Sequence, residues 1–227
     1  MSPKKPPDQT PPTVLITGFE AFENDETNAS WEVARALDGW ICEGALVRAV
    51  QLPCVFGAAI ERLDEALGQW RPRLVISLGQ ASGRAEITPE RVAINLDDAR
   101  IADNEGRQPI DIPVISGAPA AYFSSLPVKA IVRDLRSAGL PASLSNSAGT
   151  FVCNHVFFAL MHRLATHRPL AGTRGGFVHM PCLPEHAARR SGLPSLGLAT
   201  QVEAIRHLTR TALTVQDDVR ESGGQIH

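Results

Sequence analysis

Short apolar runs that recur along the chain constrain its fold more than any other feature. Thr13–Gly18 and Arg73–Gly79 are apolar, contain β-branched residues and end in glycine, and Gly175–Pro181 is a third apolar run. Residues 30–37 and 55–70, which lie between the first two runs, carry apolar side chains at helical spacing. Strands that alternate with helices predict βαβ units and a parallel sheet. Ligands of such sheets bind beyond the carboxyl ends of the strands.

Further segments extend this α/β pattern. We expect additional strands at residues 45–53, 87–95 and 142–145, and additional helices at residues 127–138 and 154–166. A last helix is expected to start at Thr200, because Thr200 and Glu203 have the spacing of a capping box. Residues 80–115 interrupt the alternation with a long irregular stretch, and insertions of this kind are usually functional or disordered.

The composition is that of an ordinary globular protein and excludes several classes of partner. Hydrophobic residues make up 44% of the chain and charged residues 20%, which suits one large α/β domain or at most two small ones. The formal net charge is −2, so no basic field attracts nucleic acid or anionic lipid. No apolar run approaches the roughly 18 residues of a membrane span. We therefore expect no nucleic acid and no membrane as partners.

The ends of the chain and its cysteines predict a cytoplasmic protein. Residues 1–12 are proline-rich and lack the apolar core of a signal peptide, so we expect a disordered tail there. Residues 13–220 are expected to form one α/β domain, and residues 221–227 a frayed C-terminus. The four cysteines are widely spaced without a CxxC pair, which predicts reduced thiols rather than a disulfide framework.

One cysteine, Cys153, stands where a helix is predicted to begin. A turn rich in serine and glycine, residues 145–150, precedes it, and apolar residues at helical spacing follow it. The free N–H groups and the dipole of a first helical turn favour a negative charge, and a thiolate is the reactive form of cysteine. A small buried core cysteine is the alternative, since most free cysteines are of that kind.

Cys153 and His179 suggest a cysteine hydrolase. His179 ends an apolar strand, and such an enzyme needs a thiol, a base and a carboxylate that orients the base. The carboxylate is left open by this pattern, although Glu90 stands where an apolar strand begins and is expected to be partly buried. A satisfied histidine of the core or surface is the alternative for His179.

A metal site is the alternative to a catalytic thiol and base at Cys153 and His179. Soft or imidazole ligands are available from Cys153, His155, His179, Cys182 and His186. The chain has no CxxC, HxxxH or HExxH motif, which makes a zinc site improbable. It also has no phosphate-binding glycine motif after a strand. We therefore expect neither metal nor cofactor.

The loop after the first strand contains two phenylalanines, Phe19 and Phe22, among acidic residues. Loops usually carry polar side chains, so these rings either pack beneath the loop or form the wall of a hydrophobic pocket. Both interpretations remain open from this segment alone.

Several blocks of the sequence resemble pyroglutamyl peptidase I, also called pyrrolidone-carboxylate peptidase. They follow the family order from about residue 13 to residue 215. The blocks are 17–22 (TGFEAF), 79–84 (GQASGR), 87–95 (ITPERVAIN), 103–106 (DNEG) with Gln108 and Pro109, 148–155 (AGTFVCNH) and 175–181 (GGFVHMP). Blocks of eight or nine residues are far more specific than a single short motif.

The resemblance implies a cysteine peptidase that removes an N-terminal pyroglutamyl residue from peptides through a thioacyl-enzyme. The family nucleophile, base and orienting carboxylate match Cys153, His179 and Glu90. The family residues around the lactam ring match Phe19, Phe22, Gln80, Phe151 and Val152, with Gln80 bonding the ring amide, and Arg100 matches an arginine near the catalytic centre. The implied fold is a single-domain α/β/α sandwich with a mixed, mainly parallel sheet, assembled as a homo-oligomer (dimer or tetramer) and free of cofactors.

This chain departs from the family pattern at several loop positions. Proline is usual at Ala21 and Ala29, glycine at Glu23, Asn24 and Ser82, and threonine at Cys54. These departures affect loop rigidity and ring binding but leave the predicted triad in place. Two alternatives remain: a cysteine amidase acting on another lactam, and a non-catalytic binder of small molecules on the same scaffold.

Overall fold

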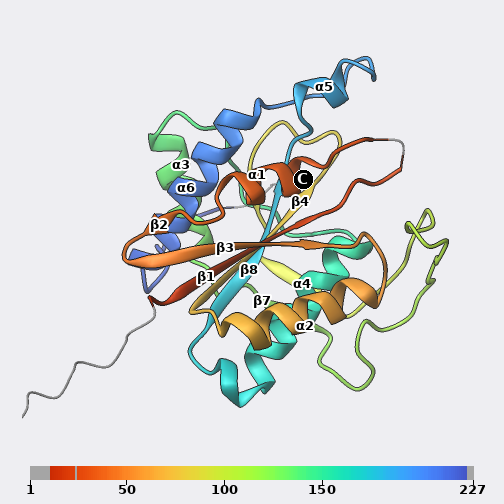
Figure 1. Cartoon of the computed structure of the whole chain (residues 1–227), viewed down its shortest axis with the longest axis horizontal. Helices are drawn as coiled ribbons and strands as arrows, with labels where there is room; N and C mark the ends of the chain where they lie inside the picture. Colours follow the sequence, from red (N-terminus) through yellow and green to blue (C-terminus); the bar gives the residue numbers. More distant parts are fainter. Residues whose placement is uncertain (1–10, 24, 224–227) are drawn as a thin grey trace, which may run out of the picture.

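The computed structural model describes residues 11–23 and 25–223, which form an α/β/α sandwich (Figure 1). Its central sheet has the strand order β2-β3-β1-β4-β8-β5. The strands of this sheet are β1 (Thr13–Phe19), β2 (Ile41–Cys42), β3 (Ala45–Leu52), β4 (Leu74–Gln80), β5 (Thr88–Pro89) and β8 (Arg174–Met180). The four central strands are parallel, whereas the edge strands β2 and β5 pair antiparallel with their neighbours. The predicted mixed, mainly parallel sheet is therefore confirmed.

Helices cover both faces of the sheet (Figure 1). The helices are α1 (Ala29–Ala36), α2 (Ala58–Trp70), α3 (Val128–Ser137), α4 (Val152–Thr166), α5 (Pro184–Ala187) and α6 (Leu198–Thr214), with a short 3₁₀ helix, η1, at Arg168–Leu170. Helices α1, α3 and α6 pack on one face over one hydrophobic cluster, and α2 and α4 pack on the other face over a second. Strands β1, β4 and β8 are buried almost throughout, because helices cover both of their faces.

The carboxyl ends of the parallel strands bring distant residues together. In the register of β4 and β8, Gly79 pairs with His179 and Gln80 pairs with Met180. On the other side of β4, strand β1 runs in the same direction and ends at Phe19. The predicted site residues at these strand ends therefore lie along one edge of the sheet.

Two predicted strands are shorter than expected. The strand expected at residues 87–95 is divided into β5 and β6 (Val92–Ile94), and β6 pairs with β7 (Ala121–Phe123) in a separate small sheet. The strand expected at 142–145 is reduced to two isolated bridges, which join Ala142 to Ile87 and Ser145 to Glu90. The division at Glu90 follows from its position, since this residue leaves the edge of the main sheet and enters a buried polar network.

The last helix begins earlier than its predicted cap. Helix α6 starts at Leu198 after Gly197, and no side chain caps it. Glu203 is directed along the helix instead, where it pairs with His207 at 3.5 Å and with Arg206 at 3.7 Å. The capping-box prediction at Thr200 was therefore wrong.

The predicted tail at residues 1–12 lies mostly outside the described residues, as do Asn24 and residues 224–227 of the predicted C-terminal segment. Pro12 is described, and its carbonyl accepts a hydrogen bond from the Leu46 amide over 2.9 Å. The Gly223 carbonyl accepts one from Arg91 over 2.9 Å. Within the described part of the chain, every helix is too short or too polar to cross a membrane.

Candidate active site

Cys153 lies at the start of α4, next to the carboxyl end of β4. It is the second residue of the helix, after Phe151 as N-cap and Val152, and no side chain caps this end. The approach of its sulfur to the sheet depends on Gly79. A Cβ atom at residue 79 would lie 3.0 Å from the Cys153 sulfur and 2.8 Å from the Phe177 ring. The absence of a side chain at Gly79 therefore allows the thiol to reach the strand that pairs with His179.

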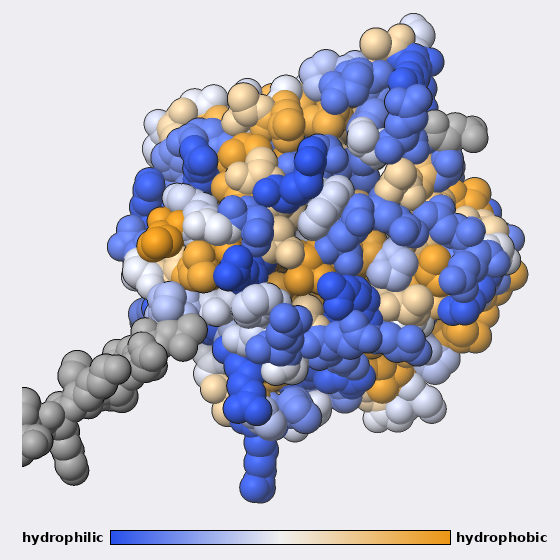
Figure 2. Space-filling view, viewed as in Figure 1, coloured by the Kyte–Doolittle hydropathy of each residue, from blue (hydrophilic) through white to orange (hydrophobic). Residues whose placement is uncertain are grey.

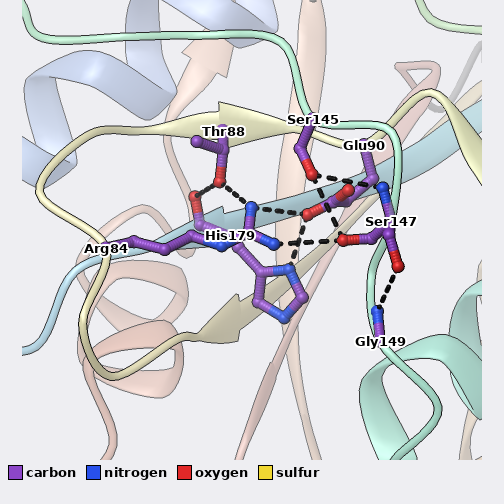
Figure 3. A network of polar contacts seen from close by, with 7 residues as sticks. All are labelled: Arg84, Thr88, Glu90, Ser145, Ser147, Gly149 and His179. Carbon is purple, nitrogen blue, oxygen red and sulfur yellow. Dashed lines mark hydrogen bonds and ion pairs between the residues drawn. The ribbon is translucent and has the colours of Figure 1, made fainter. Parts of the chain in front are cut away.

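His179 is oriented by a buried carboxylate. Its Nδ1 lies 2.8 Å from Glu90 Oε1, and both side chains are almost completely buried. An ionised carboxylate only accepts hydrogen bonds, so Nδ1 carries the proton and Nε2 is left as the basic nitrogen. Nε2 points away from the polar network around Glu90 (Figure 3). Two of the three predicted triad residues are thus in direct contact.

An arginine that the sequence did not single out completes the network around Glu90 (Figure 3). Arg84 Nη1 donates to the same Glu90 oxygen, Oε1, over 2.7 Å, and Nη2 donates to the Ser147 carbonyl over 3.1 Å. Nη1 also contacts Thr88 Oγ1, which in turn donates to the His179 carbonyl over 3.2 Å. The available signal was the position of Arg84 in the loop that follows β4.

The electrostatic environment keeps both the thiol and the imidazole neutral at rest. Burial raises the pKa of the Cys153 thiol to about 12, and the charge of Glu90 acts in the same direction. Burial also lowers the pKa of His179, and the hydrogen bond that His179 donates to Glu90 acts in the opposite direction. The position of Cys153 at a helix start is as predicted, whereas the pKa shift caused by burial opposes the thiolate that this position was expected to favour. A neutral thiol becomes nucleophilic only when a base takes its proton.

Aromatic rings form a wall beside Cys153. The ring centroids of Phe22 and Phe151 are 5.3 Å apart, and Phe56 meets Phe151 edge-on at 5.3 Å. Phe22 and Phe151 are partly exposed, whereas Phe19 and Val152 are buried behind them. Phe56 was missed in the sequence, although it follows β3 at the same edge of the sheet as the other strand ends.

A second buried histidine supports this wall. His155 packs edge-on against Phe56, and its Nδ1 lies 2.7 Å from Asp97 Oδ2. Its Nε2 accepts a hydrogen bond from the Gly57 amide over 3.0 Å. This histidine therefore has a structural environment rather than a free nitrogen for catalysis.

Gln80 is held by the first residue of α1. Its Oε1 accepts a hydrogen bond from the Ala29 amide over 2.9 Å, which leaves the Nε2 donors of the side chain available. Gln80 and Phe22 line the same small cavity. The family usually has proline at residue 29, and proline has no backbone N–H. The hydrogen bond from the residue 29 amide to Gln80 is therefore possible because this chain has alanine there.

The other departures occupy distinct places. Glu23 has a φ of +56°, a left-handed conformation that favours glycine. The Ser82 hydroxyl lies 3.4 Å from the Cys182 sulfur, and the Ala21 carbonyl accepts from Asn104 over 2.9 Å. Cys54 is buried, and its pKa is raised by burial and by the neighbouring Cys153.

Arg100 differs from the other predicted site residues. It is exposed, and within the described ranges no hydrogen bond or ion pair joins its side chain to Glu90, His179 or Cys153. Arg84 is the arginine that touches the Glu90 carboxylate.

The possible metal ligands are dispersed. No three His, Cys, Asp or Glu side chains of the described residues gather in a way that could hold an ion. His186, one of the candidates, places its Nε2 2.9 Å from the Thr27 hydroxyl. The chemistry available at this edge of the sheet is therefore that of a thiol, an imidazole and a carboxylate. This set of side chains is typical of cysteine-dependent hydrolases.

Comparison with known proteins agrees with this class. A family model described as pyroglutamyl peptidase matches residues 12–215. The pyrrolidone-carboxylate peptidase of Cupriavidus taiwanensis is 61% identical over 216 residues, which cover 95% of this chain and all of the relative. The enzyme of Klebsiella pneumoniae is 53% identical over 214 residues, 94% of this chain and 99% of the relative. The chain belongs to the pyroglutamyl peptidase family, and it is a cysteine peptidase.

Solved structures of this family share the fold. Pyroglutamyl peptidase I from Bacillus amyloliquefaciens superposes with a TM-score of 0.90 at 43% identity and covers 94% of this chain and all of its own. Pyrrolidone carboxyl peptidase from Thermococcus litoralis gives a TM-score of 0.89 at 36% identity, with 93% and 99% covered. The resemblance seen in the sequence blocks therefore extends over the whole α/β domain.

Proposed function

We propose that the protein hydrolyses the amide bond after an N-terminal pyroglutamyl residue, with Cys153 as nucleophile, His179 as general base and acid, and Glu90 as the carboxylate that orients His179. The observation that carries this proposal is the contact between Glu90 Oε1 and His179 Nδ1, which leaves Nε2 as the basic nitrogen. His179 lies in β8, next to strand β4, and the Cys153 sulfur approaches β4 at Gly79. The names of the relatives and solved structures support pyroglutamyl peptides as the substrate class.

The reaction follows from these groups in two stages. His179 Nε2 takes the Cys153 proton as the sulfur attacks the carbonyl carbon, and the imidazolium then protonates the leaving amine. Uncapped N–H groups at the start of α4 are suited to stabilise the oxyanion. Water, deprotonated by the same imidazole, then hydrolyses the thioacyl-enzyme and restores the thiol.

Ring recognition combines an apolar wall with a placed donor. Pyroglutamate carries no charged N-terminus, so an apolar slot with one or two polar groups suits it. Phe22 and Phe151 provide the accessible apolar surface, and Phe19 and Val152 support it from the same hydrophobic cluster. Gln80 Nε2 provides a donor for the ring carbonyl. Arg100, which is exposed, belongs to this proposal only as a surface contact for the peptide beyond the ring.

The test compares a chromogenic pyroglutamyl amide with its prolyl analogue, using the wild-type chain and Cys153→Ala. Turnover of the first amide alone, abolished in Cys153→Ala, is the expected result. Turnover of a different lactam amide in preference would identify the amidase alternative. Binding of pyroglutamate without any turnover would identify the non-catalytic alternative. Cys42→Ala, which removes a buried free thiol in the hydrophobic cluster on the other face of the sheet, serves as the control and should keep most of the activity.

Assembly into a homo-oligomer, a dimer or tetramer, is part of the same proposal. Six large apolar side chains of the described residues are exposed, and they include Ile110 at 64%, Ile112 at 48% and Phe123 at 72%. Figure 2 shows hydrophobic residues at the surface on the side where the loop of residues 97–118 protrudes in Figure 1. Exposed apolar groups of this kind favour association. A single monomer mass in light scattering at micromolar concentration would contradict it.

The cytoplasm is the proposed compartment. All four cysteines are free among the described residues, and a nucleophilic thiol stays reduced there.

A further inference from the structure

We propose that Arg84 is a positioning residue of the active site, whose charge balances the buried Glu90 carboxylate and allows Glu90 to orient His179 without opposing ionisation of Cys153. This inference rests on the proposed function of Cys153, His179 and Glu90.

The Glu90 carboxylate is in an unusual position for a single negative charge. The side chain is fully buried, and its Oε1 receives both His179 Nδ1 and Arg84 Nη1. Its Oε2 is buried and has no hydrogen-bond partner within the described part of the chain. A buried carboxylate that is incompletely solvated by hydrogen bonds stays ionised only next to a cation. His179 is neutral at rest, so Arg84 is the cation in contact.

Arg84 also touches the two segments that hold the reacting groups. Through Thr88 it reaches the backbone of His179, and through the Ser147 carbonyl it reaches the loop before α4. That loop has its own hydrogen bonds, from Ser145 Oγ to the Ser147 carbonyl and from the Gly149 amide to Ser147 Oγ (Figure 3). The Arg84 guanidinium thus links strand β8, which carries His179, to the loop that precedes Cys153.

The charges on the site explain why this cation matters for catalysis. Glu90 raises the pKa of both Cys153 and His179, whereas Arg84 lowers both. Glu90 and Arg84 are the two formal charges that act on Cys153 and His179. The neighbouring thiol of Cys54 is neutral, and the acids near it are Glu20 and Asp103. Without Arg84, Glu90 would hold a proton on His179 at higher pH and would repel a thiolate. The pair Arg84–Glu90 is neutral overall, so it directs the imidazole with little net field on the sulfur.

The test measures kcat/KM for the pyroglutamyl amide from pH 5 to pH 9 in Arg84→Gln and Arg84→Lys. In Arg84→Gln the acidic limb should move to higher pH, and the ratio of kcat/KM at pH 6 to that at pH 8 should fall about threefold or more. Arg84→Lys keeps the charge but not the fork of donors, so its ratio should match the wild type while its kcat is lower.

Arg163→Gln is the matched control. Arg163 also forms an ion pair through two nitrogens, with Asp64 at 2.9 Å, but on the far part of α4. Its profile should superpose on that of the wild type. If Arg84→Gln lowers kcat/KM equally at all pH values, Arg84 is only structural and the proposal is wrong. If Arg84→Gln does not fold, a shifted ratio in Arg84→Lys overturns the proposal, and an unshifted ratio supports it.

A second readout does not depend on turnover. The rate of Cys153 alkylation by iodoacetamide, followed from pH 6 to pH 9, should show the same displacement to higher pH in Arg84→Gln. If the wild type hydrolyses no pyroglutamyl amide, the proposed function fails while this measurement still tests Arg84. An unchanged alkylation profile in Arg84→Gln would refute the role of Arg84 even in an active peptidase.

Discussion

Gly79 and Cys153 are in a contact that no other residue type at position 79 would permit. A Cβ atom added to Gly79 would lie 3.0 Å from the Cys153 sulfur, closer than carbon and sulfur normally approach. Gly79 is also the backbone partner of His179 in the neighbouring strand β8. The first prediction follows from this contact.

Gly79→Ala should lower kcat/KM by about tenfold or more, because a displaced nucleophile has a poorer attack geometry and a misplacement of about 1 Å can cost about 10²-fold. The added methyl also meets the Phe177 ring, so the free energy of unfolding should fall by about 1–3 kcal/mol. Gly68→Ala, at an exposed position in α2 with open space around it, is the control and should be neutral or slightly stabilising. Wild-type kcat/KM in Gly79→Ala would show that the sulfur does not need this approach.

Glu90→Gln should reduce turnover by something like the ~10⁴-fold seen when an orienting acid of a triad is neutralised, because an amide does not hold the required tautomer of His179. The steady-state kcat of the folded variant is the measurement, with circular dichroism as a check of folding. Asp98→Asn and Glu105→Gln change acids that are exposed and should leave kcat nearly unchanged. A large loss of kcat in Asp98→Asn or Glu105→Gln, with normal turnover in Glu90→Gln, would assign the orientation of His179 to that other acid.

Ala29→Pro should narrow the preference for pyroglutamyl over prolyl amides while keeping the fold. Proline is favourable at the first helical position, and Asn28 already has the extended backbone (φ −130°, ψ 125°) that suits a residue before proline. The substitution removes the N–H that holds Gln80 Oε1, so the Nε2 donor is no longer oriented. The measurement is the ratio of kcat/KM for the two amides.

Two variants separate the orientation of Gln80 from its chemistry. Gln80→Glu keeps the acceptor for Ala29 but removes the donor, and Gln80→Leu removes both; each should cost about 1–3 kcal/mol of discrimination. Phe22→Ala should instead mainly raise KM for both amides, as expected for lost apolar contact. If the ratio is unchanged in all Gln80 and Ala29 variants, ring recognition comes from backbone groups around Phe19 or Val152.

The free energy of unfolding should decrease as the pH falls below about 6.5, the ordinary pKa of histidine. Burial lowers the pKa of His179 in the folded state, so below that pH the unfolded chain binds a proton that the folded chain does not. Urea denaturation at pH 7.5 and pH 5.5 measures the difference, and His179→Asn should show a smaller decrease than the wild type. An equal decrease in both proteins would mean that other groups account for it.

The sequence by itself determined those strands and helices that can be predicted from a short run of neighbouring residues. Apolar runs such as Thr13–Gly18 and Arg73–Gly79 have one stable environment, the interior of a parallel sheet, and they predicted β1 and β4 to within a residue or two. The start of the helix near Cys153 was also predicted correctly, because the helical spacing of the apolar residues after it can be seen in the sequence. The blocks around Glu90, Cys153 and His179 were sufficient to identify the family.

Tertiary structure decided everything that depends on desolvation and on contacts between distant segments. In the sequence, Phe56 lies in a segment with helical spacing and Arg84 lies in a block that resembles the family, without a role for either. Only the packing of the strand ends brings Arg84 to Glu90 and Phe56 to Phe151. The pKa of Cys153 was also decided by packing, because the cost of burying a thiolate depends on what surrounds the sulfur. The sequence specifies which groups are present, and the fold sets their distances and their exposure to water.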